Sequence, residues 1–243
     1  MIRYLLLLLL LFLPQNPGPS VTGTNAGGVL SANLIGWWPV NEGGAATVAL
    51  DFSGNSNNGT WHGSKNCSGS YYSNGTPALS PFNYTGCFYN YSNYVLTTYA
   101  SNLNITTNLT LSAWANFTAR AACAEVISNL SPTNGYELIA CGGMYFQVGN
   151  AGVYKSTPQI SFTNGVWYHF CATYDGTAGT LYINGVPQSG PFSASSAIGS
   201  STSAVTLGAR PSGSQPMNGF IADARVYNSV QSCAALYAAG PKS

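Results

Sequence analysis

The sequence predicts an all-β fold of antiparallel strands, arranged as a sandwich or barrel. Apolar and polar residues alternate with period two in about ten short runs, which Gly, Asn, Ser and Pro separate. No long stretch has the 3.6-residue period of a helix, and no strand–helix–strand spacing indicates a parallel sheet. Apolar residues make up 45 % of the chain and aromatic residues 13 %, which is sufficient for a large core.

The predicted strands follow one another along most of the chain. The return strand 180–183 comes after the loop that Asp175-Gly176 opens, and Asn184-Gly185 after it is the strongest short-range turn signal. Only 232–239 is compatible with a short helix. The predicted strands cover 34–40, 94–99, 109–114, 124–128, 136–140, 144–148, 166–175, 180–183, 204–208 and 219–227.

Charged residues are scarce, and this excludes several classes of function. They make up 5 % of the chain, against roughly 25 % in an ordinary soluble domain. The net charge of +1 excludes a nucleic-acid partner, because phosphate binding needs clustered Lys and Arg. Six carboxylates leave little material for acid–base catalysis or a dedicated metal cage. Gly, Ser, Thr and Asn replace the charges, as in extracellular β-proteins that meet neutral partners.

The first residues are typical of a secretory signal peptide. Arg3 precedes an apolar run from Leu5 to Leu13, which is too short for the about 20 residues that a membrane span needs. Thr24 and Ala26 are the small residues that a signal peptidase reads, so cleavage is predicted after Ala26. We therefore predict a signal peptide over 1–26 and one secreted domain over 27–243, with no membrane span in the mature chain.

An even number of cysteines in an exported chain indicates disulfides. Cys67 and Cys87 bracket a loop rich in Ser, Asn and Tyr, and Cys123 and Cys141 flank a predicted hairpin. These two pairings are favoured. Cys171 lies inside a strand and is interpreted as a small buried hydrophobe, and Cys233 is left unassigned. No Cys-x-x-Cys motif supports zinc.

Four segments carry a family resemblance in a fixed order. The first has a Trp-Pro opening and an Asp-x-Ser-Gly-Asn turn, and the second an alternating Ser-x-Trp strand. The third has a Trp-x-His hairpin that ends in Asn-Gly, and the fourth an Asp-x-Arg-x-Tyr-Asn strand. They are LIGWWPVNEGGAATVALDFSGNSNNGTWHG (34–63), NLTLSAWANF (108–117), GVWYHFCATYDGTAGTLYINGV (165–186) and LGARPSGSQPMNGFIADARVYNSV (207–230). Together they resemble the laminin-G-like branch of the concanavalin A-like lectin/glucanase superfamily, which implies a two-sheet jelly-roll sandwich.

That superfamily hosts lectins, adhesion modules, enzymes and spacers, so the fold does not assign the function. Its glucanases carry a Glu-x-Asp-x-x-Glu strand with two carboxylates about 5 Å apart. This sequence lacks the motif, and its nearest acidic pair is Glu125 and Glu137. We therefore expect no enzyme, and no two carboxylates that face each other in a cleft.

The resemblance also implies roles for four charged residues. Some relatives bind a structural Ca²⁺ through one early and one late acidic residue, which makes Asp51 and Asp223 the candidates here. The alternative is that Asp51 closes an Asx-turn and that Asp223 pairs with Arg225 or another neighbour. Glu42 and Arg225 are expected to form a partly buried ion pair. No cofactor is required.

The histidines lack the partners of a catalytic base. His169 lies two residues after Trp167 in a strand, and no third group is marked to orient it, so it is predicted to be a packed strand residue. His62 is predicted to lie in a loop.

Aromatic residues crowd into one Asn- and Ser-rich segment. Tyr and Trp rings stack on the apolar face of a sugar, while amides and hydroxyls bind its rim. The alternative is that these rings fill the core. The candidate carbohydrate-binding residues are Trp61, Tyr71, Tyr72, Tyr84, Tyr89 and Tyr91.

Asn-x-Ser/Thr motifs, the acceptors of N-linked glycans, recur along the chain and are interpreted as a consequence of its composition. The motifs begin at Asn58, Asn66, Asn74, Asn83, Asn90, Asn104, Asn108, Asn116 and Asn129.

The function we predict is a secreted, non-catalytic domain that binds carbohydrate or cell-surface glycan, or mediates adhesion. The first alternative is a structural or protein-interaction module of a surface, envelope or appendage, and the second is a glycoside hydrolase.

Overall fold

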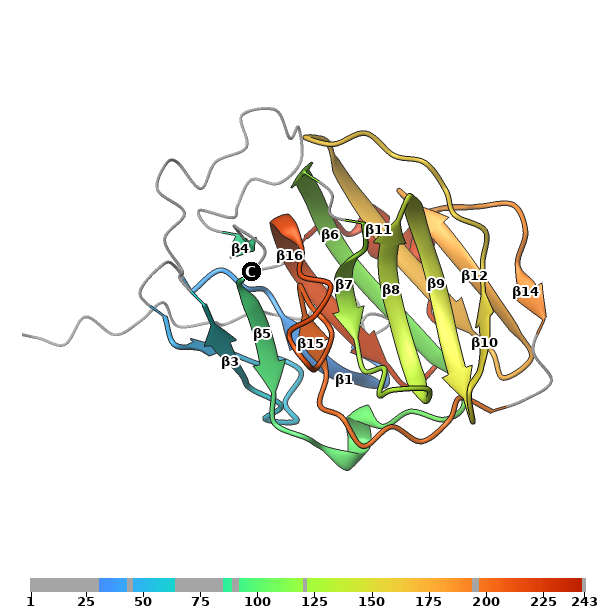
Figure 1. Ribbon diagram of the computed structural model, residues 1–243, viewed down its shortest axis with the longest axis horizontal. Coiled ribbons are helices and arrows are strands. Elements are labelled where there is room, and N and C mark those ends of the chain that lie inside the picture. The colour runs from blue at the N-terminus through green and yellow to red at the C-terminus, as the bar shows by residue number, and fades with distance from the viewer. Residues whose placement is uncertain are drawn as a thin grey trace, which may run out of the picture.

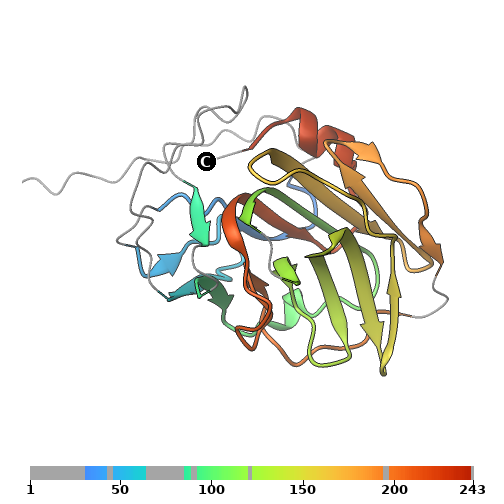
Figure 2. The ribbon, with the colours of Figure 1, turned by 45° about the horizontal axis from the view of Figure 1, so that its top comes forward.

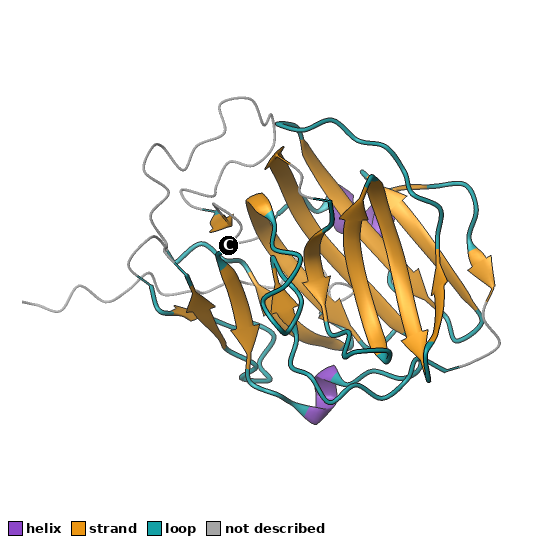
Figure 3. Cartoon of the chain, viewed as in Figure 1, coloured by secondary structure: helices purple, strands orange, loops and turns teal. Residues whose placement is uncertain are grey.

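The computed structural model describes residues 31–42, 46–63, 85–88, 92–119, 122–193 and 197–241. Within these ranges the chain forms two stacked antiparallel sheets (Figure 1). Strands make up nearly all of the regular structure that is described, beside one 3-10 turn, η1 (Ser101–Leu103), and one short helix, α1 (Cys233–Ala238) (Figure 3). The predicted signal peptide 1–26 lies outside the described residues. The same holds for Cys67, Tyr71, Tyr72, Tyr84, Tyr89 and Tyr91.

The first sheet, sheet A, has the strand order β1-β16-β6-β11-β12-β13, with β14 paired to β12 and β4 paired to β16. All of its pairings are antiparallel. Its described strands are β1 (Leu34–Trp38), β4 (Gly86–Phe88), β6 (Leu109–Ala119), β11 (Trp167–Tyr174), β12 (Ala178–Ile183), β13 (Val186–Pro187), β14 (Phe192–Ser193) and β16 (Asn218–Tyr227).

The second sheet, sheet B, has the order β10-β9-β8-β7-β15-β5-β3-β2, again with antiparallel pairings. The all-β prediction is confirmed, and most predicted strands lie within two or three residues of the observed ones. The described strands of sheet B are β2 (Val48–Ala49), β3 (Gly59–His62), β5 (Tyr94–Thr97), β7 (Ala124–Ser128), β8 (Gly135–Cys141), β9 (Gly143–Asn150), β10 (Val153–Ser156) and β15 (Thr206–Leu207).

The core lies between the two sheets and consists of the inward side chains of alternate positions. On β6 these are Leu111, Ala113 and Phe117, and sheet B supplies residues such as Leu138 and Phe146. Because successive side chains of a strand point to opposite faces, the same alternation leaves a second set of residues on the outer face of each sheet. These outer faces carry the charged and polar clusters of the domain.

The outer face of sheet A is covered in part by α1, which lies beside the gold and orange strands in Figure 2. Ser232 caps this helix by accepting a hydrogen bond from the Ala235 backbone N–H. A disulfide joins Cys233 at the start of the helix to Cys171 on β11. The interpretation of Cys171 as an unpaired hydrophobe is therefore wrong, although the residue is fully buried.

Candidate functional site

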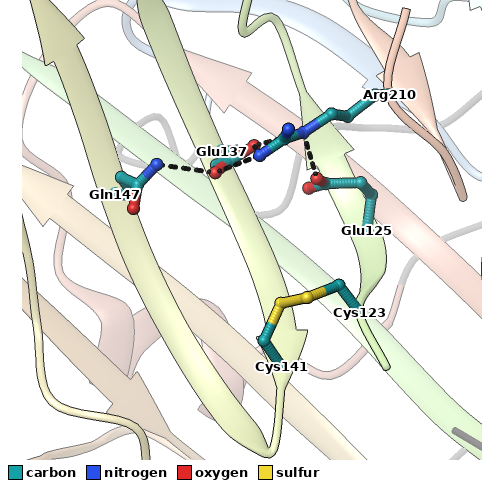
Figure 4. The surroundings of a disulfide bond; sticks show 6 residues. All are labelled: Cys123, Glu125, Glu137, Cys141, Gln147 and Arg210. Atoms are coloured by element: carbon teal, nitrogen blue, oxygen red, sulfur yellow. Dashed lines mark hydrogen bonds and ion pairs between the residues drawn. A yellow bond between two sulfur atoms is a disulfide. The ribbon is translucent and has the colours of Figure 1, made fainter. Parts of the chain in front are cut away.

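Four polar side chains meet on the outer face of sheet B, and we call them the carboxylate–arginine cluster. Arg210 lies between Glu125 on β7 and Glu137 on β8, with Gln147 of β9 on the far side of Glu137 (Figure 4). The Arg210 Nη2 donates to both oxygens of Glu137, at 3.1 and 3.0 Å. Its Nε donates to Glu125 Oε1 at 3.0 Å and to Glu137 Oε2 at 3.2 Å. Gln147 Nε2 donates to Glu137 Oε1 at 2.9 Å.

The hairpin formed by β7 and β8 brings the two glutamates together. Cys123 and Cys141 form a disulfide at its open end, which is the pairing that the spacing favoured. Glu125 then faces Ile139, and a bulge before Ile127 shifts the register so that Glu137 faces Ser128. The two glutamates thus lie on the same face of neighbouring strands. The predicted disulfide implied the pairing of Glu125 with Ile139, and hence Glu137 on the same face, but not the bulge that follows.

Arg210 comes from the loop between β15 and β16, which crosses the outer face of sheet B. Within the loop, the Gly213 N–H donates to the Arg210 carbonyl and the Arg210 N–H to the Ser214 carbonyl. The loop is also attached to β7, because the Glu125 N–H donates to the Gln215 carbonyl. No periodicity marks a loop residue, so the role of Arg210 could not be predicted from the sequence.

Burial controls the charge of this cluster. The side chains of both glutamates are fully buried, and that of Arg210 is 28 % exposed. Burial raises the pKa of Glu125 well above its ordinary value, the neighbouring Glu137 raises it further, and Arg210 opposes both effects. Burial also raises the pKa of Glu137, while Arg210 again acts in the opposite direction. Glu125 Oε2 is buried and accepts no hydrogen bond from the described residues, so it is the oxygen suited to carry a proton.

Two carboxylates lie side by side here, and both are buried against Arg210. Their arrangement nevertheless differs from the acid and nucleophile of a glycosidase. Both groups are inaccessible to solvent, and the guanidinium of Arg210 lies against both. A substrate has no path to their oxygens without displacing Arg210. The cluster is therefore suited to holding the loop on the sheet.

Neutral groups surround the cluster on the same face. Tyr145 of β9 lies opposite Ile139 of β8, and Ser156 of β10 lies opposite Gln147 of β9. Tyr145 and Gln147 are half-buried, and Ser156 is exposed. Burial, together with the nearby carboxylates of Glu137 and Glu125, raises the pKa of the Tyr145 hydroxyl. This surface offers a phenol ring, an amide and a hydroxyl at the edge of a guanidinium.

Asp51 closes a turn, and all of its oxygen positions are used. Its Oδ1 accepts from the backbone N–H groups of Trp37 and Ser53, both at 2.9 Å. Its Oδ2 accepts from the Ser53 hydroxyl and the Asn57 N–H, both at 2.8 Å. Ca²⁺ requires six to eight oxygen ligands. These groups do not fit such a site, and in the ranges described no three His, Cys, Asp or Glu residues gather as metal ligands.

Asp223 pairs with Arg225, which is the alternative that the sequence left open. Asp223 Oδ1 lies 2.9 Å from Arg225 Nη2 and accepts from the Trp37 indole N–H at 2.8 Å. The guanidinium of Arg225 also lies 5.0 Å from the Trp37 ring centroid. The expected pair of Glu42 and Arg225 is therefore wrong. Glu42 instead accepts from the Leu50 N–H at 2.7 Å.

His169 is a buried strand residue, as predicted. Its Nε2 lies 2.9 Å from the Ser112 hydroxyl, but its Nδ1 has no partner among the described residues. Burial and the charge of Arg225 lower its pKa to about 3. A catalytic base needs an orienting group and a pKa near the working pH, and this pair has neither.

Trp61 and His62 lie on opposite faces of β3. Trp61 packs against the core at 5.3 Å from Phe88, a placement that favours the core-filling alternative. His62 stacks on Tyr94 of β5 at 4.6 Å, so it belongs to a strand and not to a loop. Cys87 on β4 is disulfide-bonded.

The fold defines a two-sheet jelly-roll domain, and the sequence places the chain in a family. A family model described as the concanavalin A-like lectin/glucanases superfamily matches residues 89–235. The chain therefore belongs to this superfamily, as the four segments predicted. A search of the curated proteins finds no match.

Solved structures share the jelly-roll fold at low sequence identity. One is the receptor binding domain of a botulinum neurotoxin C/D mosaic serotype, with 12 % identity and a TM-score of 0.62. The match covers 86 % of this chain and 52 % of that one, so the chain spans about half of the toxin domain. The binding domain of botulinum neurotoxin DC in complex with SialylT matches with 13 % identity, a TM-score of 0.61 and coverages of 86 % and 52 %.

A third structure is similar over nearly its whole length. It is Domain 4 of AbnA, an extracellular arabinanase from Geobacillus stearothermophilus, in complex with arabinotriose. Identity is 15 %, the TM-score is 0.61, and the match covers 85 % of this chain and 97 % of that one. At such identities the comparison shows a common fold.

Two disulfides among the described residues indicate the kind of cellular compartment in which the chain folds. The disulfides Cys123–Cys141 and Cys171–Cys233 are typical of an oxidising, extracellular environment. None of the helices described has the length and apolarity to cross a membrane.

Proposed function

We propose that this chain is a secreted, non-catalytic carbohydrate-binding domain, exported by the signal peptide 1–26 and folded as one domain over 27–243. The observation that carries the proposal is the state of the acidic groups. Glu125 and Glu137 are buried against Arg210, and Asp223 is paired with Arg225. On the outer face of sheet B, a ligand therefore meets mainly neutral groups beside the partly exposed Arg210.

Neutral groups suit a neutral ligand with many hydroxyls. Rings stack on the C–H face of a sugar, and amides or hydroxyls bind its rim. Tyr145, Gln147 and Ser156 supply these groups on sheet B. The tyrosines of the segment 71–91 supply further rings. The arabinanase domain solved with arabinotriose supports the proposal, because it matches this chain over nearly its full length.

The test is a glycan array, followed by calorimetric titration of arabino- and sialyl-oligosaccharides. We expect saturable binding without release of reducing sugar. Replacing Tyr71 and Tyr72 with Ala should weaken affinity and leave the melting temperature nearly unchanged. Tyr99→Ala is the matched control, because Tyr99 is 53 % exposed and lies outside the segment.

Three outcomes contradict parts of this proposal. A large fall in melting temperature for the double variant would show that these rings fill the core. Hydrolysis of an oligosaccharide would establish a glycoside hydrolase. Absence of binding to any glycan, with a defined protein partner in its place, would establish a protein-interaction module.

A further inference from the structure

The structure divides the asparagines of the Asn-x-Ser/Thr motifs into two groups. N-glycosylation modifies the side-chain Nδ2 atom, so an acceptor that stays modified must have this atom free and facing solvent. Asn58, Asn104, Asn108, Asn116 and Asn129 lie in the described ranges. The other four motifs lie outside these ranges and take no part in the inference.

Two of the five asparagines bury the atom that would carry the glycan. Asn116 is 3 % exposed, and its Nδ2 donates to the Gly165 carbonyl at 3.1 Å. Asn129 is 1 % exposed, and its Nδ2 donates to the Ser203 carbonyl at 2.8 Å. An oligosaccharide on either residue is incompatible with the packed fold.

The Asn104 side chain is unavailable to carry a glycan for a different reason. It is half-buried, and both ends of its amide are used. Its Nδ2 donates to the Ser200 hydroxyl at 2.8 Å, and its Oδ1 accepts from the Ser201 N–H at 2.9 Å. This residue ties the end of η1 to the segment before β15.

Asn58 and Asn108 have the opposite arrangement. Asn58 is exposed just before β3, and its Oδ1 accepts from the Asp51 N–H at 2.8 Å. That bond holds the amide in place and leaves Nδ2 without a partner among the described residues. Asn108 is exposed just before β6, and no hydrogen bond is formed by its side chain in the part of the chain that is described.

We infer that Asn58 and Asn108 are N-glycosylation sites of the folded protein, and that Asn104, Asn116 and Asn129 remain unmodified. The donor is a polyprenyl-pyrophosphate-linked oligosaccharide. A bond forms between Nδ2 and the anomeric carbon, the bond from that carbon to the pyrophosphate oxygen breaks, and the proton lost from Nδ2 leaves with the released polyprenyl pyrophosphate. Transfer takes place on the emerging chain, and a chain that carries a glycan on a buried asparagine cannot reach the packed fold. The inference rests on export of the chain and is independent of its ligand.

The test is to produce the full chain in a eukaryotic secretory host and to map the secreted, folded protein. Peptide-N-glycosidase in ¹⁸O-water converts each occupied Asn to a labelled Asp, which peptide mass spectrometry locates. We expect the label at Asn58 and Asn108 and none at Asn104, Asn116 or Asn129. A glycan on Asn116 or Asn129 of the folded protein, or none on Asn58 and Asn108, would overturn the inference.

Matched variants separate modification from folding. Asn58→Gln and Asn108→Gln should each remove one glycan mass. Asn108→Gln should leave the melting temperature of the deglycosylated protein unchanged, whereas Asn58→Gln should lower it slightly, because it disturbs the exposed hydrogen bond to the Asp51 N–H. Asn116→Gln and Asn129→Gln should leave the glycan mass unchanged and lower the melting temperature by several degrees, because each loses a buried hydrogen bond. The reverse pattern in both pairs would contradict the assignment.

Discussion

Arg210 forms a two-point contact with Glu137, although 73 residues separate them along the chain. The contact joins a loop to the middle of β8 and makes the outer face of sheet B an ordered surface. Bidentate pairing gives an arginine geometric specificity that a lysine lacks. The order of the loop between β15 and β16 therefore depends on two buried carboxylates and one partly exposed cation.

Removing the cation should strongly destabilise the fold. Arg210→Met leaves Glu125 and Glu137 buried without their counter-ion, and breaking a buried pair in this way costs about 3–5 kcal/mol. We expect a fall of this size in the free energy of unfolding, measured with urea at neutral pH. Arg210→Lys is the matched control. It should lose less free energy of unfolding, because lysine retains the positive charge but lacks the planar guanidinium that pairs with both oxygens of Glu137.

A triple variant shows whether the loss comes from the carboxylates. Adding Glu125→Gln and Glu137→Gln to Arg210→Met removes the uncompensated charge, so most of the lost free energy should return. If the triple variant is as unstable as Arg210→Met, the loss reflects packing of the arginine stem and the electrostatic explanation is wrong.

Glu125 should make the stability depend on pH above its ordinary pKa of 4.5. Burial raises its pKa in the folded protein, so the folded state binds a proton that the unfolded chain has lost. The contribution is fully present below pH 4.5 and is lost as the pH rises through the raised pKa. Glu125→Gln cannot lose a proton. Its unfolding free energy, minus that of the wild type, should therefore increase from pH 4.5 to pH 8.

Glu42 and Glu137 also have raised pKa values and contribute slopes of the same sign. The Glu42 slope is common to the wild type and the variant. Glu137 interacts directly with Glu125, so the difference between the two profiles reports this interacting pair. A difference that stays constant over this range would show that Glu125 is ionised in the folded protein.

His169 should make the protein less stable as the pH falls, which is opposite in sign to the effect of Glu125. Its pKa falls from 6.5 to about 3 on folding, so the unfolded chain takes up a proton that the folded state refuses. The unfolding free energy should thus fall by about 2 kcal/mol between pH 6.5 and pH 5 through this group alone. In His169→Gln this part of the slope should vanish. Ser112→Ala, which keeps the histidine, should lower stability and retain the slope.

The sequence predicted the parts of this protein that follow a period or a spacing. Alternation along 109–114 placed Leu111 and Ala113 in the core, and the spacing of Cys123 and Cys141 indicated their disulfide. Both signals are local. The register of that hairpin also placed Glu125 and Glu137 on one face, a consequence that the search for a glucanase motif overlooked.

The remaining features depend on contacts between distant segments or on local breaks in strand geometry. Cys171 meets Cys233 only because α1 folds back over sheet A, and 62 residues separate them. Asp223 turns toward Arg225 at a bulge in β16, where its φ of 54° departs from strand geometry. Such a bulge has no periodic signature, so the sequence left the Asp223–Arg225 pair as one alternative and also expected a pair of Glu42 and Arg225.

Calcium should not stabilise the domain. The oxygens of Asp51 already accept four hydrogen bonds, and Asp223 is paired with Arg225. We expect the same melting temperature in chelator and in millimolar Ca²⁺. Asp51→Ala should lower the unfolding free energy by roughly 1–3 kcal/mol in both solutions, because it leaves several part-buried donors unpaired. A rise in the wild-type melting temperature with Ca²⁺ would show that the turn rearranges to bind the ion.

The two disulfides should differ in their contribution to stability. Cys123 and Cys141 are 18 residues apart, whereas Cys171 and Cys233 are 62 apart. Loop-closure entropy predicts about 3 kcal/mol for the shorter loop and about 4 kcal/mol for the longer one. Alanine pairs at each site, compared by urea unfolding, should follow this order. The longer loop also attaches α1 to sheet A, so its loss should additionally expose Trp114 and red-shift the tryptophan emission. An unshifted spectrum would show that packing of Tyr237 on Trp114, at 5.6 Å, holds the helix without the covalent link.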